Sequence, residues 1–121
     1  MEKNTSRSIK GRIQSIRYAL KGLDHLIRTE PNASIHLIAT FAVIITGLIT
    51  GLTRMEWIAI TIAIGIVWIA EGFNTCIELL CNACLGTKYD KRVEVIKDIS
   101  AAAVLIASIV SVVIGVIVFF F

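Results

Sequence analysis

Three long apolar runs dominate this sequence and constrain its fold more than any other feature. They cover residues 33–52, 57–85 and 98–121. About 20 helical residues are enough to cross the ~30 Å hydrocarbon core of a bilayer. Because 56% of the 121 residues are hydrophobic, a soluble domain of this size would have more apolar surface than its core can bury. The sequence therefore predicts an all-α membrane protein with three transmembrane helices, and residues 1–121 form one domain.

The segment before the first run, residues 8–28, has the pattern of an amphipathic helix. Its apolar residues recur every three or four positions and line one helix face: Ile9, Ile13, Ile16, Leu20, Leu23 and Ile27. Basic residues such as Lys10 and Arg17 occupy other parts of its surface. We expect a helix that lies at the membrane interface, although packing on other protein would suit the same pattern. The first thirty residues are too polar for a cleavable secretory signal, so we expect none.

The placement of Lys and Arg predicts the orientation in the membrane. Seven of them lie in the first 34 residues, one in the turn at 52–56 and four in the loop at 86–97. By the positive-inside rule, the N-terminus and the second loop are cytoplasmic. Next to membrane spans, such a basic region is expected to meet anionic head groups or the phosphates of a soluble ligand, and not nucleic acid.

Two carboxylates and an amide interrupt the second apolar run. Glu71, Asn74 and Glu78 are spaced i, i+3 and i+7, so they share one helix face. A charge near the middle of a span costs about 2.5 to 3.5 kcal/mol on insertion scales, and buried membrane acids are usually functional. The deeper Glu71 is placed to act as a general base on the hydroxyl of a lipid.

Further polar residues are expected at the cytoplasmic ends of the spans. Glu30 and His36 flank the start of the first span, and Lys97 and Asp98 lie at the start of the third. Carboxylates such as Glu30, Glu78 and Asp98 offer hard oxygen ligands for Mg²⁺, which fills its shell with water and nucleotide phosphates. Taken singly, each of these residues also suits a helix-end cap. No P-loop motif is present, so a phosphoryl-transfer enzyme here would use another architecture.

Small residues indicate close helix packing. Gly47 and Gly51 form a GxxxG motif, and small residues let helices approach closely in lipid. Because three short spans enclose little space, we expect an oligomer. The three cysteines, Cys76, Cys81 and Cys84, lack the partners of a zinc site and are expected to be packing residues.

Several motifs resemble the small prokaryotic integral-membrane lipid kinases, the diacylglycerol kinase and undecaprenol kinase family. The most specific is Glu71-Gly-Phe-Asn74-Thr75-Cys-Ile-Glu78. Next is Lys97-Asp98, followed by a small-residue run and AVLIA. Near the N-terminus, Lys21-Gly-Leu, Thr29-Glu-Pro-Asn and Ile35-His36 match in order and spacing. The resemblance covers the chain from about Tyr18 onwards.

This resemblance implies a homotrimer in the bacterial cytoplasmic membrane, with active sites shared between protomers. It implies transfer of the γ-phosphate of ATP, with Mg²⁺, to the hydroxyl of a membrane lipid alcohol. By position, Glu71 is the catalytic base, and Glu71 and His36 meet the lipid. Glu30 and Glu78 hold the metal. The implied nucleotide-binding residues are Tyr18, Glu30, Asn74, Glu78, Lys97 and Asp98.

The chain also departs from the family pattern. Asn82 stands where the family often has Asp, and the loop Lys88-Tyr89-Asp90 replaces its usual residues. These departures leave an inactive homologue as one alternative. A second alternative, which rests on the membrane carboxylates Glu71 and Glu78, is a small oligomeric channel or proton carrier. The residues around Glu30 and His36, with Glu56-Trp57, favour undecaprenol over diacylglycerol as substrate.

Overall fold

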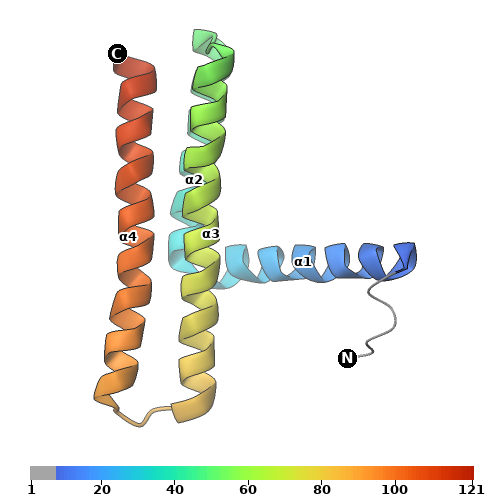
Figure 1. Cartoon of the computed structure of the whole chain (residues 1–121), viewed down its shortest axis with the longest axis vertical. Helices are drawn as coiled ribbons and strands as arrows, with labels where there is room; N and C mark the ends of the chain where they lie inside the picture. Colours follow the sequence, from blue (N-terminus) through green and yellow to red (C-terminus); the bar gives the residue numbers. More distant parts are fainter. Residues whose placement is uncertain (1–7) are drawn as a thin grey trace. The chain divides into compact units, whose positions relative to one another are not determined.

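The computed structural model is all-helical and describes residues 8–121. Its four helices are α1 (Ile9–Thr29), α2 (Pro31–Thr50), α3 (Arg54–Leu85) and α4 (Lys91–Phe120) (Figure 1). Three of them, α2, α3 and α4, are long and apolar enough to cross a membrane, which confirms the predicted all-α class and its three spans. The chain divides into two compact units, one ending at Ser34 and one running from Ile35 to Phe121. Lys3 and Arg7, two of the basic residues counted above, lie outside the described residues.

In the first unit, local hydrogen bonds fix the ends of α1. The Ser8 side chain accepts a hydrogen bond from the Gly11 N–H and caps the first turn. The helix ends at Thr29, and the C-cap residue Glu30 has an extended backbone and precedes Pro31. Because proline disfavours a helical conformation in the residue before it, the chain breaks there and restarts as α2. Apolar side chains of α1 such as Ile9 and Ile16 are exposed within this chain.

In the second unit, α3 and α4 pack against each other as an antiparallel hairpin (Figure 1). A capping box begins α3: the Glu56 N–H donates to Thr53 Oγ1 at 3.3 Å, and the Thr53 N–H donates to Glu56 Oε2 at 2.8 Å. Ser111 Oγ donates to the Ala63 carbonyl oxygen at 2.8 Å and links the two helices. The buried apolar side chains of this unit are Ile60, Ala63, Val67 and Ala107.

The start of α4 differs from the expected one. The helix begins at Lys91, not at residue 98, so most of the expected polar loop is helical. Asp90 caps it by accepting from the Arg92 N–H, and the Arg92 side chain holds the pKa of Asp90 at about 2. A run of apolar residues indicates only the part of a helix that lies in lipid. Where the helix continues into water its residues are charged, so hydropathy does not identify that part as helical.

The hairpin is longer than the membrane requires. With 32 and 30 residues, α3 and α4 extend for about 48 and 45 Å at 1.5 Å per residue. The 20 residues of α2 cover only about 30 Å. The hairpin therefore extends beyond a single bilayer core, and charged residues near its loop, such as Lys91 and Arg92, indicate that it does so at the loop end.

The two glycines of the GxxxG motif have different roles. Gly51 has a positive φ of 73°, and its N–H and that of Leu52 both bond to the Gly47 carbonyl, which ends α2. Gly47 instead lies against Trp57. A Cβ atom at Gly47 would come within 2.8 Å of Trp57 Cη2 and 2.9 Å of Leu52 Cδ1. Within one chain, Gly51 of this motif therefore ends α2, and Gly47 allows the close approach of Trp57 on α3.

Replacing Gly47 should destabilise the packing of α2 on α3. We expect Gly47→Ala to lower the thermal unfolding midpoint in lipid nanodiscs, with a loss of about 1–3 kcal/mol typical of overpacking. Gly65→Ala is the matched control, because a Cβ there meets nothing within 4 Å and alanine favours helix. Equal midpoints for the two variants would contradict this account.

Candidate active site

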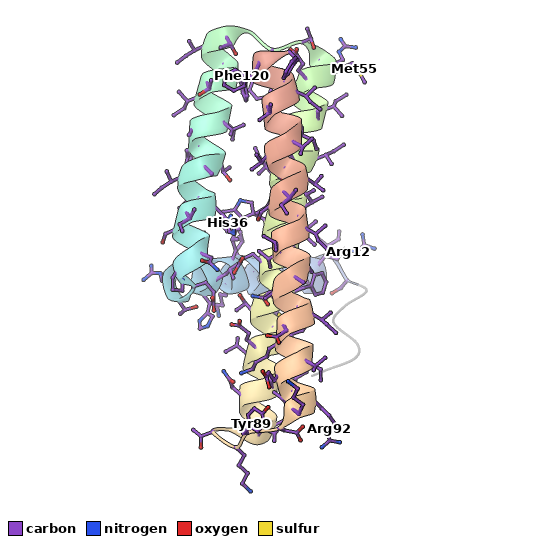
Figure 2. All side chains as sticks on the ribbon, turned by 90° about the vertical axis from the view of Figure 1, so that its left-hand side faces the viewer. Arg12, His36, Met55, Tyr89, Arg92 and Phe120 are labelled. Atoms are coloured by element: carbon purple, nitrogen blue, oxygen red, sulfur yellow. The ribbon has the colours of Figure 1, made fainter. Side chains whose placement is uncertain are left out.

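The centre of the candidate site is a buried contact between α2 and α3. Glu71 is fully buried, and its Oε2 lies 3.2 Å from Nε2 of His36. Figure 2 shows His36 on the side of α2 that faces the hairpin. His36 comes five residues after Pro31, so the pair lies about 8 Å inside the start of α2. Two residues that the sequence singled out separately therefore meet.

A second hydrogen-bonded link joins the same two helices one turn away. Trp68 Nε1 donates to Thr40 Oγ1 at 3.0 Å, and Thr40 Oγ1 donates to the His36 carbonyl oxygen at 2.7 Å. The rings of His36 and Trp68 meet edge to face, with centroids 6.1 Å apart. We did not predict Thr40 and Trp68. The signal for them was present, since each lies about one turn from a predicted site residue on the same face.

Three buried oxygens of α3 lack a hydrogen-bond partner in the part of the chain that the structure describes: Glu71 Oε1, Asn74 Oδ1 and Thr75 Oγ1. Asn74 and Thr75 are 7% and 5% exposed. An unsatisfied buried polar group costs about 1–3 kcal/mol. Each of these three oxygens retains unused capacity to accept a hydrogen bond. Thr75 belongs to the family motif quoted above, but we did not predict it as a site residue.

An apolar cavity adjoins this network. Its volume is about 310 Å³, and side chains of α2, α3 and α4 line it. His36 and Thr40 form part of its wall, and Ser108, Ser111 and Gly115 lie on the α4 side. A second cavity, of about 390 Å³, lies between α3 and α4 and is lined by Asn74 and Ser100 among apolar residues.

The remaining predicted residues of the hairpin lie towards its loop. Glu78 is half-buried, and its carboxylate has no hydrogen-bond or ion-pair partner among residues 8–121. Lys97 Nζ donates to Asn82 Oδ1 at 2.8 Å, and Asp98 is exposed. Lys97 thus pairs with the residue that departs from the family pattern. In the nearby loop, a hydrogen bond to Glu94 raises the pKa of the Tyr89 hydroxyl.

Tyr18 and Glu30 belong to the first unit. Tyr18 is exposed, and Lys21 Nζ lies 5.9 Å from its ring centroid. Glu30 is half-buried at the end of α1. Within the described residues, no three His, Cys, Asp or Glu side chains come together as a metal site. Because Mg²⁺ takes only one or two carboxylates and fills its shell with water and phosphates, the free carboxylate of Glu78 fits this ion.

Comparison with known proteins identifies the family. The sequence profile of prokaryotic diacylglycerol kinases matches residues 17–119, which is most of the chain. The chain belongs to the prokaryotic diacylglycerol kinase family. This is a family of multi-pass bacterial membrane enzymes that phosphorylate a lipid alcohol, so the predicted recognition and enzyme class are confirmed. A kinase family implies ATP as co-substrate.

Two relatives illustrate the range of this kinase family. A diacylglycerol kinase of Synechocystis sp. is 29% identical over 115 residues, which cover 95% of this chain and 66% of the relative. An undecaprenol kinase of Bacillus subtilis is 32% identical over 106 residues, which cover 88% of this chain and 85% of the relative. No solved structure matches the chain significantly.

Proposed function

We propose that this chain is an ATP-dependent kinase that transfers the γ-phosphate to the hydroxyl of a membrane lipid alcohol. The observation that carries the proposal is the buried carboxylate of Glu71, with Oε2 against His36 and Oε1 without a partner in residues 8–121. A carboxylate in this position is suited to accept a proton from a hydroxyl. Membership of a kinase family supports this reading over a channel or proton carrier.

The proposed reaction needs one proton transfer and one displacement. The lipid hydroxyl donates a hydrogen bond to Glu71 Oε1, while His36, with a proton on Nε2, holds Oε2. The hydroxyl oxygen attacks the γ-phosphorus, its proton passes to Glu71, and the bond from the γ-phosphorus to the bridging oxygen breaks. ADP leaves with the electron pair of that bond. Such catalysis depends mainly on positioning and on neutralising charge.

The nucleotide is proposed to bind on the cytoplasmic side of Glu71. Lys97 and Asp98 contact it, with Asn74 and Tyr18 nearby, and Glu30 and Glu78 hold Mg²⁺, which neutralises phosphate charge when bound. The unpartnered Glu78 carboxylate and Asn74 oxygen support this assignment. Glu78 lies seven positions after Glu71 on α3, about 10 Å along the helix axis. This spacing supports a site in which the phosphates bind next to the lipid head group.

The proposal includes the placement in the membrane. The N-terminus and the 86–90 loop are cytoplasmic, and α1 is an amphipathic helix that lies at the interface. The exposed apolar residues of α1 and the uneven distribution of Lys and Arg support this. The assembly is a homotrimer with shared sites, consistent with the small apolar core of one chain.

We propose undecaprenol as the preferred substrate, supported by the similarity to the Bacillus enzyme. In the test, the purified protein in lipid nanodiscs is given labelled ATP and either undecaprenol or diacylglycerol. We expect kcat/KM to be at least about tenfold higher for undecaprenol than for diacylglycerol, which corresponds to a difference of about 1.4 kcal/mol in transition-state stabilisation. A higher value for diacylglycerol would overturn the substrate assignment but leave the kinase assignment intact.

Lys97 gives a separate prediction for the nucleotide end of the site. Lys97→Met removes a cation that contacts Asn82 and is proposed to neutralise phosphate. We expect KM for ATP to rise about tenfold, as for the loss of one charge-assisted hydrogen bond, with KM for the lipid unchanged. Lys91→Met on the same helix is the control. Equal effects of the two substitutions would contradict a specific role for Lys97.

A further inference from the structure

We propose that Thr40 and Trp68 are positioning residues, which hold His36 against Glu71 Oε2 and thereby keep Oε1 free for the lipid hydroxyl. This inference rests on the proposed function, in which Glu71 is the base. It adds two residues that do not contact the reacting atoms. They act through the orientation of His36.

The hydrogen bonds between these residues have one possible direction. The indole Nε1–H of Trp68 can only donate, and it meets Thr40 Oγ1 at 3.0 Å. The single proton of the Thr40 hydroxyl is then directed to the His36 carbonyl oxygen, 2.7 Å away on the same helix. The hydroxyl therefore connects α3 to the backbone of the residue that carries the imidazole.

Two cross-links result, about one helical turn apart. Thr40 follows His36 by four residues on α2, and Trp68 precedes Glu71 by three on α3. Because the two helices are antiparallel, His36 pairs with Glu71 and Thr40 pairs with Trp68 on matching faces. Two links fix the register and the rotation of α2 on α3, which a single link would not do.

The Trp68 ring also restricts the rotation of the His36 imidazole directly. Its centroid lies 6.1 Å from that of His36, with the planes inclined at 66°. The His36 side chain is only 16% exposed, and Glu71 is fully buried. Both His36 and Thr40 also form the wall of the apolar cavity. A rotated imidazole would release Oε2, and both carboxylate oxygens would then compete for the hydroxyl proton.

The test uses three conservative substitutions and measures kcat and KM in lipid nanodiscs. Thr40→Val removes the hydroxyl at constant shape, and Trp68→Phe removes the N–H but keeps a ring. We expect each to lower kcat about 10- to 100-fold, as for a small displacement of a catalytic group, with KM for ATP unchanged. Thr40→Ser, which keeps the hydroxyl, should retain kcat within about threefold. The double variant should lose no more than the larger single loss.

A background without the imidazole separates positioning from general packing. In a His36→Ala protein, Trp68→Phe should cause no further loss of kcat, because the group that it positions is gone. If Trp68→Phe lowers kcat by the same factor in both backgrounds, or if Thr40→Val has wild-type kcat, the inference is wrong.

A measurement without turnover distinguishes a failure of the inference from a failure of the proposed function. The chain has two histidines, His25 and His36, so ring-¹⁵N labelling gives two assignable imidazoles. We expect Trp68→Phe to move the His36 nitrogen resonances and leave those of His25 in place. Absence of phosphate transfer in the wild type would refute the proposed function alone. Unchanged His36 resonances would refute the positioning inference.

Discussion

Glu71→Gln should lower the rate of phosphate transfer to the lipid by orders of magnitude while the protein remains folded. Glutamine keeps the size and a hydrogen-bonding oxygen, but it cannot take a proton from the hydroxyl. General-base catalysis contributes about 10²- to 10⁴-fold, so a loss of this order in kcat is expected. The measurement is the initial rate of labelled lipid phosphate formation in nanodiscs at saturating ATP. KM for ATP should change little, because the nucleotide contacts are proposed to lie elsewhere.

The matched control for this substitution is Glu56→Gln. Glu56 is a carboxylate in the first turn of the same helix, where it forms a capping box that glutamine also completes. We expect wild-type activity from this variant. A Glu71→Gln protein with activity similar to that of Glu56→Gln would rule out Glu71 as the base.

The second large effect is expected at Glu78. Glu78→Gln removes a carboxylate proposed to hold Mg²⁺, and the Mg²⁺ concentration for half-maximal rate should rise by roughly 100-fold, since the ion is held by few protein ligands. Glu78→Asp keeps the charge and should give an intermediate value. The measurement is the rate of transfer as a function of Mg²⁺ at fixed ATP, and chelation of divalent cations should stop the wild-type reaction.

Glu94→Gln provides the comparison for Glu78. Glu94 lies near the loop on α4 and already has local partners, Tyr89 and Lys91. Its loss should leave the Mg²⁺ dependence unchanged. If Glu78→Gln has the same Mg²⁺ dependence as the wild type, the metal is held by other groups and the assignment of Glu78 is wrong.

The spans could be predicted because their signal is strong and local. Each apolar run is as long as a bilayer is thick, and the structure places a helix over each one. The start of α4 was missed for the converse reason. Residues 91–97 form helix stabilised by an Asp90 cap and by side-chain pairs such as Lys91 with Glu94, and this stretch is too polar to be recognised from hydropathy.

The sequence predicted which residues belong to the candidate site, but not the distances between them. The spacing of Glu71, Asn74 and Glu78 on one helix fixes their common face. The distance from His36 to Glu71 depends on the register between α2 and α3, which no local pattern encodes. That register follows from long-range contacts, such as Trp68 with Thr40 and Trp57 against Gly47. The same limitation explains why the pairing of Lys97 with Asn82 was not predicted.

The most direct test of the account is transfer of labelled γ-phosphate from ATP to a lipid alcohol by the purified wild-type protein. The protein is placed in nanodiscs with Mg²⁺ and undecaprenol, and its folded state is confirmed by circular dichroism. The account predicts that label appears in the lipid fraction as a lipid monophosphate, in proportion to time and enzyme. A folded protein that transfers no label to undecaprenol or to diacylglycerol would contradict the account.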